Sequence, residues 1–396
     1  MNLVAPFGFY GCGNIGDEAT LQGFAKLVQV HGSSIKVRVA SQDPLHTAQV
    51  EPEFGYYRYD AACRNPLGRW ARYSSRGYVV PGGTPIMDGL GAWPLCELVP
   101  LVRAAYRRAK PVAFVGTGTE SLHREESRRL VAENLARQVI HWSVRSDRDR
   151  QRLVTYGVPH ERITVAADMG WLLPKVSADF GRRVLSAHGL DGARLVAVNV
   201  NDERAVLARE PRLFEKLATL LDGLVDTHGV RILFLCNEVR PGGTFDKETS
   251  ERVLSLMKRK DHALLLPPVY WWPQEMMSVI ASCCLTISTR YHFCLFSALQ
   301  DVPFVAIQRS DKVIDLCADL NWPYGAIPGA VDVVSLEEQV TDLFRAQRSA
   351  DHLGQLRDRV HAMRERAWRN RFPLQALIAS ASQTRRTRSL AAVSRS

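Results

Sequence analysis

Short apolar runs alternate with helical patterns along most of this chain, and the alternation starts again after Pro174. Strands that alternate with helices form a parallel sheet joined by right-handed crossovers. Two such sets predict two α/β domains, which also fits a length of 396 residues. The expected strands are 3–9, 35–40, 77–80, 111–115, 141–145 and 163–168 in the first set and 195–200, 231–235, 263–266, 285–288 and 304–307 in the second.

The domain boundary is expected between residues 175 and 190, which gives an N-terminal domain over 1–178 and a C-terminal domain over 179–345. Apolar residues at helical spacing over 349–371 predict an amphipathic helix, within a segment 346–373 that packs across the two domains. From Gln383 onward the chain is rich in Ser, Thr and Arg and has too few apolar residues to fold. We therefore expect a basic, disordered tail over 374–396.

The net charge of +10 is concentrated at the C-terminal end. From Arg345 onward there are twelve arginines, no lysine and three acidic residues, so this segment carries +9 and the rest of the chain about +1. A nucleic-acid-binding domain more often carries its cations on the fold itself, so no nucleic-acid partner is expected. Two interpretations of the segment stay open, a merely solvated helix or a segment that binds anionic lipid head groups at a membrane.

The composition argues against several classes of protein. No apolar run approaches the ~20 residues of a membrane span, and no signal peptide opens the chain. The eight cysteines include no CxxC pair, which indicates reduced thiols rather than disulfides or a zinc site. No His, Cys and Asp cluster has the spacing of metal ligands, so no metal is expected. The expected location is the cytoplasm, with the inner face of the membrane as the place to which a lipid-binding tail would bring the protein.

The stretch from Leu285 to Leu299 carries the strongest signal for a binding site. A short buried strand runs into a helix with no Gly or Pro between them, so the turn is tight. Arg290 and His292 lie in that turn, at the start of the helix. A cation and an imidazole beside backbone N–H groups make an anion site. The alternative for each residue alone is structural, an arginine that caps a neighbouring carbonyl and a histidine satisfied in the core. Open α/β sheets also bind their ligands at the carboxyl ends of strands.

The segment Gly11-Cys12-Gly13-Asn14-Ile15-Gly16-Asp17-Glu18 matches the G-x-G-x-x-G pattern of dinucleotide sites. Asp17 and Glu18, however, place negative charge where a pyrophosphate needs the positive end of a helix. No acidic residue ends the second strand either. We therefore expect a loop that exposes the Asp17 carboxylate, lets a substrate approach its glycine backbone and offers Asn14 to a sugar hydroxyl. The alternative is that Asp17 caps its own helix.

Four further places at or after strand ends carry candidate site residues. Gly82-Gly83 and Gly116-Thr117-Gly118 end two strands of the first sheet, and such glycine turns line clefts in many sheets. Arg145 ends the fifth strand, where a lone arginine is usually a salt-bridge partner. Lys312 follows the strand after the Arg290 turn and would face the same edge.

Together these residues resemble the polysaccharide pyruvyl transferase family, from residue 3 to about 320. The resemblance rests on the glycine loop, Gly82-Gly83, Val144-Arg145, Arg290-Tyr291-His292 with its Phe296-Ser297-Ala298 helix, Val302-Pro303-Phe304 and Lys312-Val313. It implies two Rossmann-like domains with parallel sheets, arranged as in B-type glycosyltransferases, with the active site between them. It also implies a role in the biosynthesis of exopolysaccharide or other cell-envelope polysaccharide.

The resemblance further implies phosphoenolpyruvate as donor and a sugar that carries a ketal-linked pyruvate as product. Arg145 and Arg290 match positions that hold the donor's phosphate and carboxylate, and Lys312 matches a basic residue near the donor. His292 matches the family's essential histidine, and Asp17 the aspartate of its glycine loop. Tyr291 stands where the family usually has Leu, and Ser146 where an Asp usually follows the Arg.

These residues support a specific mechanism. His292 would act as general acid toward the donor's methylene carbon or the departing phosphate, and Asp17 would accept a hydroxyl proton. Arg145, Arg290 and Lys312 would stabilise the phosphate as it leaves. The mechanism needs no cofactor besides phosphoenolpyruvate as co-substrate. The acceptor stays open among a lipid-linked sugar, a polymer and a small metabolite.

Three alternatives remain. A glycosyltransferase of the same two-domain fold would use a nucleotide sugar and needs an acidic ribose or base contact, for which Glu238 and Asp246 are candidates. A non-catalytic scaffold would bind membranes through the basic tail. A nicotinamide-dependent oxidoreductase is disfavoured by Asp17 and Glu18.

Overall fold

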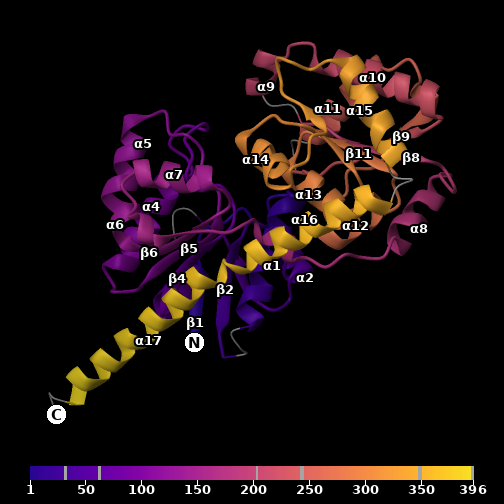
Figure 1. Cartoon of the computed structure of the whole chain (residues 1–396). Helices are drawn as coiled ribbons and strands as arrows, with labels where there is room; N and C mark the ends of the chain where they lie inside the picture. Colours follow the sequence, from indigo (N-terminus) through magenta and orange to yellow (C-terminus); the bar gives the residue numbers. More distant parts are fainter. Residues whose placement is uncertain (31–33, 61–63, 202–203, 241–244, 347–349, 394–396) are drawn as a thin grey trace. The chain divides into compact units, whose positions relative to one another are not determined.

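The computed structural model describes residues 1–30, 34–60, 64–201, 204–240, 245–346 and 350–393 and divides into two compact units (Figure 1). Unit 1 consists of Met1–Cys12, Asp17–Leu172 and Arg364–Ser396, and unit 2 of Gly13–Gly16 and Leu173–Met363. The main boundary therefore falls at Leu172, a few residues before the expected range. Part of the glycine loop belongs to unit 2, and the C-terminal end of the chain belongs to unit 1.

Unit 1 is built on a seven-stranded parallel sheet in the order β3-β2-β1-β4-β5-β6-β7. The order reverses between β1 and β4, and ligands of such sheets bind at the carboxyl ends of the strands beside the reversal. The strands are β1 (Asn2–Ala5), β2 (Lys36–Ser41), β3 (Gly55–Arg58), β4 (Gly77–Pro81), β5 (Val112–Thr117), β6 (Val139–Val144) and β7 (Ile163–Val165).

Helices cover both faces of this sheet. On one face Leu98 and Val102 of α4 pack with Phe114 and Trp142, whose ring centroids lie 4.1 Å apart. The helical segments before Leu172 are α1 (Ile15–Val30), α2 (Pro44–Val50), α3 (Pro66–Ser74), α4 (Leu95–Tyr106), α5 (Glu125–Leu130), η1 (Val131–Leu135), α6 (Ala136–Gln138), α7 (Asp147–Thr155), η2 (His160–Arg162) and η3 (Met169–Leu172).

Unit 2 repeats the arrangement with a six-stranded parallel sheet in the order β10-β9-β8-β11-β12-β13, which reverses between β8 and β11. Its strands are β8 (Leu195–Asn199), β9 (Arg231–Phe234), β10 (Ala263–Leu265), β11 (Leu285–Ser288), β12 (Phe304–Ile307) and β13 (Gly325–Ala326). Its helical segments are α8 (Asp179–Ala187), α9 (Arg204–Arg209), α10 (Leu213–His228), α11 (Phe245–Leu256), η4 (Lys260–His262), α12 (Pro273–Ile280), α13 (Tyr291–Leu299), α14 (Asp311–Asp319) and α15 (Val333–Ala346).

The C-terminal end of the chain differs from the sequence expectation. The expected helix ends early, as α16 (Ala350–Trp368), whose residues up to Met363 belong to unit 2 and the rest to unit 1. The disordered tail expected from residue 374 is corrected, because α17 (Arg371–Val393) packs on β4, β5 and β6. Leu374, Leu377 and Ala381 are buried there. Residues 394–396 of that expected tail lie outside the described residues.

Two smaller differences have local causes. The first strand was expected to reach Phe9 but ends at Ala5, since Pro6 has no backbone N–H to donate to a ladder. The edge strand β3 was not expected, because four residues that include a glycine carry little period-two pattern. Within the described part of the chain, no helix is both long and apolar enough to cross a membrane.

Candidate active site

The carboxyl edge of the unit 2 sheet brings Arg290 and His292 together, as the sequence predicted. β11 ends at Ser288, Arg290 is the N-cap residue of α13, and His292 is the second residue of that helix. β11 pairs with β8 at the point where the strand order reverses. The pair therefore lies where a parallel sheet of this kind binds its ligand.

Arg290 is buried in a network of carboxylates. Its Nε donates to Oδ1 of Asp246 over 3.0 Å, and its Nη2 pairs with both Asp246 and Glu238. Burial acts to lower the pKa of Arg290, but the charges of Asp246 and then Glu238 outweigh burial and raise it above the ordinary value. The guanidinium is therefore a permanently charged and rigidly held group.

Asp246, from the first turn of α11, is the centre of this network and is fully buried. Its carboxylate accepts hydrogen bonds from the backbone N–H groups of Asn237 (2.9 Å) and Glu238 (3.0 Å). The Nδ2 groups of Asn199 (3.0 Å) and Asn201 (3.2 Å) donate to it as well. Asn199 is the last residue of β8 and Asn201 lies two residues beyond it; the sequence reasoning singled out neither.

His292 is half-buried between aromatic rings and the glycine loop. Its ring meets Tyr291 edge-to-face with centroids 5.1 Å apart, and Phe296 lies one helical turn further at 6.3 Å. A Cβ placed on Gly16 would lie 2.1 Å from Nδ1 of His292. Only glycine fits at this position with the imidazole where it is.

The segment Gly13–Gly16 is bonded to the loop that follows β9. The N–H of Val239 donates to the carbonyl of Gly13 over 2.6 Å, and the N–H of Ile15 donates to the carbonyl of Asn237 over 3.1 Å. Gly13 has φ +81°, and a Cβ there would lie 1.9 Å from the Val239 carbonyl oxygen. The Oδ1 atom of Asn14 accepts from the N–H of Gly16 (3.0 Å) and from Asn237 (3.3 Å), so Asn14 has a structural role in the loop.

The next strand along the same edge adds two cations. Lys312 is the second residue of α14 and is half-exposed, one strand away from Arg290. Arg309, which the sequence reasoning did not single out, donates from Nε to the carbonyl of Thr289 (2.8 Å) and from Nη1 to Oδ1 of Asn201 (3.3 Å). The carboxyl edge of unit 2 thus carries Arg290, His292, Arg309 and Lys312.

Arg145 belongs to unit 1, where it ends β6. Its Nε forms an ion pair with the fully buried Asp168 (2.9 Å) and donates to the carbonyl of Gly116 (3.0 Å). Asp168 also accepts from the N–H of Gly170 over 2.7 Å. The carboxylate that holds Arg145 therefore comes from Asp168, which follows β7. It does not come from a residue directly after Arg145 in the sequence.

Ser146 has a different function, as the N-cap of α7. Its hydroxyl accepts from the N–H of Asp149, and the Asp149 carboxylate accepts from the N–H of Ser146. Asp149 also holds both the N–H (2.7 Å) and the hydroxyl (2.8 Å) of Thr119. Burial raises the pKa of Asp149, against these hydrogen bonds and the Arg145 charge. Asp147 is exposed and pairs with Arg150.

The unit 1 end of the glycine loop holds a carboxylate in place. Oε1 of the fully buried Glu18 accepts from the N–H of Gly11 over 2.7 Å. This backbone N–H is therefore engaged by a side chain of the loop itself. The half-buried Asp17 lies in the first turn of α1. Burial, then the charges of Asp17 and Glu18, raise the pKa of Tyr10 well above its usual value. These features support the expectation that the loop is no dinucleotide cradle.

Gly82 and Gly83 form a turn after β4, beside the strand reversal of unit 1. The N–H of Gly82 donates to Val115 and the carbonyl of Gly83 accepts from Gly118, both over 2.8 Å. The predicted site residues thus divide between the units. Unit 2 holds Arg290, His292, Lys312, Gly13, Asn14 and Gly16, and unit 1 holds Asp17, Arg145, Gly11, Gly82 and Gly83.

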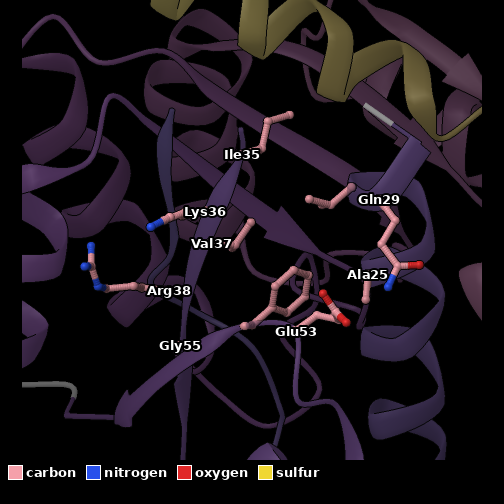
Figure 2. A pocket seen from close by; sticks show the side chains of 10 residues that line it. Ala25, Gln29, Ile35, Lys36, Val37, Arg38, Glu53 and Gly55 are labelled. Carbon is pink, nitrogen blue, oxygen red and sulfur yellow. The ribbon is translucent and has the colours of Figure 1, made fainter. Parts of the chain in front are cut away.

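A pocket of about 350 Å³ in unit 1 lies away from these residues. It is lined by the end of α1, by Ile35 to Arg38 at the start of β2 and by Glu53 to Gly55 before and at the start of β3. In Figure 2 the Lys36 and Arg38 side chains extend away from those of Gln29 and Glu53, so charged groups do not converge there. Because the pocket adjoins the amino ends of strands, it is not the expected ligand site. The described residues include no group of three or more His, Cys, Asp or Glu side chains that could hold a metal ion.

Comparison with known proteins identifies a family and a fold. A model of the polysaccharide pyruvyl transferase family matches residues 14–311. No curated protein matches the chain.

Several solved structures share the fold. The Anabaena protein Alr3699/HepE in complex with UDP-glucose is 11% identical, with a TM-score of 0.63 over 97% of this chain and 100% of that one. The UDP-GlcNAc 2-epimerase of Methanocaldococcus jannaschii is 11% identical, with a TM-score of 0.57 over 87% and 92%. A glycosyltransferase of Rickettsia africae is 8% identical, with a TM-score of 0.56 over 96% and 98%. The predicted fold class, two Rossmann-like domains as in B-type glycosyltransferases, is confirmed.

Proposed function

Because this chain belongs to the polysaccharide pyruvyl transferase family, we propose that it transfers pyruvate from phosphoenolpyruvate to two hydroxyls of a sugar. The product is a pyruvate ketal, and phosphate is released. The observation that carries the proposal is the pair of Arg290 and His292 at the N-terminus of α13, beside the strand reversal of unit 2. That position offers an anionic donor fixed positive charge, backbone N–H groups and a proton-transfer group.

The donor is small and carries both a carboxylate and a phosphate, so it needs more than one cation. Arg290 is already held by Asp246 and Glu238, whose two carboxylates exceed its single positive charge, although Glu238 also pairs with Arg240. Lys312 and Arg309, at the carboxyl end of the neighbouring strand, supply further positive charge. We assign phosphate binding to this set together with the first turn of α13, and the donor-binding role of Arg145 stays a prediction.

The reaction balances with the two hydroxyl protons of the acceptor. Both sugar oxygens form bonds to the central carbon of the donor, and the bond from that carbon to the phosphate oxygen breaks. One proton ends on the methylene carbon, which becomes a methyl group, and the other leaves with the phosphate. His292 acts as general acid toward the methylene carbon or the phosphate, and Asp17 accepts a hydroxyl proton.

The test is phosphate release from phosphoenolpyruvate, screened over hexose and N-acetylhexosamine acceptors. His292→Ala should lower the rate by ~10²–10⁴, the usual contribution of a general acid. His262→Ala is the matched control, since that histidine lies on η4 of the same unit with its side chain 48% exposed. A folded His292→Ala protein that releases phosphate at the wild-type rate would refute the acid role. Asp17→Asn tests the base in the same assay.

The alternative is a glycosyltransferase that uses a nucleotide sugar. It is favoured by the shared fold with a protein solved in complex with UDP-glucose. The acidic residues available for a ribose contact, Glu238 and Asp246, both bind Arg290 instead. Asp246 also lies in the first turn of α11. Turnover of UDP-glucose without phosphoenolpyruvate would favour this alternative.

A further inference from the structure

The helix α3 of unit 1 exposes three large apolar side chains on one side. Leu67 is 62% exposed, Trp70 52% and Tyr73 78%. They recur every third residue and so share one face of the helix, while the buried Gly68 and Ala71 lie on its inner face. A soluble surface rarely places two aromatic rings and a leucine together in this way without a partner.

A groove of about 550 Å³ between α3 and α4 continues this surface. Trp70 and Tyr73 line it together with three arginines, Arg69, Arg72 and Arg108. We call these side chains, together with Leu67, the aromatic–arginine face: Leu67, Arg69, Trp70, Arg72, Tyr73 and Arg108.

The chain around this face is strongly basic. The segments 64–76 and 98–119 contain seven arginines and one lysine and no acidic residue. One carboxylate, Glu97, lines the groove, and it accepts hydrogen bonds from Nε1 of Trp93 (3.3 Å) and from the hydroxyl of Tyr59. The face therefore carries a clear excess of positive charge.

We propose that the aromatic–arginine face binds the surface of a bilayer that contains anionic lipids. Trp and Tyr favour the level of the lipid head groups, because their rings are apolar and their tips are polar. A helix with Arg on its polar flanks and Trp or Leu on the other side lies in the plane of that interface. The arginines then contact lipid phosphates while their stems lie along the apolar side chains.

The geometry favours a lipid surface over a single-stranded nucleic acid. Bases bind aromatic side chains by stacking on an open ring face. The guanidinium of Arg38 lies over the ring of Trp70, 4.0 Å from its centroid, and Nζ of Lys110 lies 5.9 Å from the centroid of Tyr73. A ring whose face a cation already covers can still insert its edge among head groups.

The face is separate in sequence from the basic segment after Arg345, for which lipid binding is one of two open interpretations. Removal of residues 384–396 takes away four of the twelve arginines of that segment and leaves the buried part of α17 in place. The face contributes apolar insertion as well as charge, so part of its binding should persist at high salt. The two contributions can therefore be measured separately.

The test is co-sedimentation of the full chain with vesicles of phosphatidylcholine, alone or with about 30% phosphatidylglycerol. Wild type should bind the anionic vesicles at least tenfold more tightly than the neutral ones. Trp70→Ser/Tyr73→Ser and Arg69→Gln/Arg72→Gln should each weaken that binding on the order of tenfold, since each arginine near an anionic surface contributes substantially. Trp272→Ser is the control, a tryptophan of α12's N-cap in unit 2 that is 40% exposed.

Each outcome decides the question. Loss of binding in both double variants, with Trp272→Ser and the 384–396 deletion close to wild type, supports the face. Wild-type binding by both double variants overturns it, as does an equal loss in Trp272→Ser. Binding that disappears only with the deletion assigns the membrane contact to the basic tail instead. Tight binding to a single-stranded oligonucleotide with none to vesicles also overturns the proposal. Circular dichroism melting checks that the surface variants remain folded.

Discussion

Arg290 combines two features, a position suited to an anion and a place in a buried ion-pair network. Its position at the start of α13 suits an anion, yet its guanidinium is already bound to Asp246 and Glu238. A charge held by buried partners loses no freedom when a ligand arrives, so it needs no reorganisation at the moment of reaction. The same partners also make Arg290 part of a buried ion-pair network within unit 2.

Removal of Asp246 should therefore destabilise the protein. Asp246→Ala leaves Arg290 buried without its main partner and takes an acceptor from Asn199 and Asn201. Breaking a buried ion pair costs about 3–5 kcal/mol. Urea unfolding followed by tryptophan fluorescence measures the loss. Asp261→Ala, at a side chain 78% exposed, should change the free energy of unfolding by less than about 0.5 kcal/mol. Equal effects of the two substitutions would contradict the network.

Gly16 should be required for catalysis through the histidine beside it. In Gly16→Ala the new methyl group would overlap Nδ1 of His292 and must displace the ring. A displacement near 1 Å can cost on the order of 10²-fold in rate. The measurement is kcat for phosphate release at saturating phosphoenolpyruvate. Gly89→Ala is the control, since a Cβ there meets nothing within 4 Å. Unchanged kcat in Gly16→Ala would show that the position of His292 is unimportant.

At the scale of elements, α17 acts as a structural layer of unit 1. Leu377 is fully buried, and its side chain lies against Gly77 at the start of β4. Leu377→Ala should lower the free energy of unfolding by about 2–5 kcal/mol, the usual cost of a truncated core leucine. Gln375→Ala, on the exposed side of the same helix, should have little effect. Thermal or urea unfolding of the pair distinguishes a packed helix from the tail that the composition suggested.

The strand β6 supplies a pH prediction. Burial lowers the pKa of His141 from its ordinary 6.5, and its Nε2 lies 2.9 Å from the hydroxyl of Thr164 on β7. The unfolded chain therefore takes up this proton at a higher pH than the folded protein. The stabilising effect of the neutral ring is complete above pH 6.5 and declines as pH falls toward the lower folded value. Urea unfolding of wild type and His141→Gln between pH 5 and 8, the range that histidine titrates, should show a shallower pH dependence in the variant.

The sequence predicted most strands and the turn at Arg290, because buried apolar runs and the helical spacing after them are strong local signals. β11 and β12 occupy the ranges expected. The pairing of Arg145 with Asp168 was not predictable, since their side chains meet only through the order of β6 and β7. Asn199 and Arg309 were missed for the same reason. Their roles depend on neighbours that lie far away in the sequence.

At the scale of the whole molecule, the two sheets repeat one plan. Each starts its strand order from a central strand, β1 or β8, and reverses beside it. The two reversals nevertheless hold different side chains, because the cations cluster at the unit 2 edge while the unit 1 edge carries glycine turns and the pair of Arg145 with Asp168. The shared strand order thus predicts where on each sheet a ligand binds. The side chains at that edge determine the chemistry of the ligand.

Phosphoenolpyruvate alone should therefore stabilise the protein. A ligand at a hundredfold excess over its Kd adds about 2.7 kcal/mol to the free energy of unfolding. Hydrogen exchange should slow in residues 288–292 and 309–312, and the thermal midpoint should rise. Pyruvate, which lacks the phosphate, is the control ligand and should do less. No change with phosphoenolpyruvate, together with protection by UDP, would favour the nucleotide-sugar alternative.

The packing of α17 has a consequence for how the protein is made. The face of the first sheet that α17 covers is complete only after residues 371–393 have been made. During synthesis the ribosome delivers residues 173–363 of unit 2 before α17 emerges, so until then the sheet of unit 1 lacks one of its covering helices. Loss of α17 would therefore uncover β4, β5 and β6, strands that lie more than 200 residues earlier in the sequence.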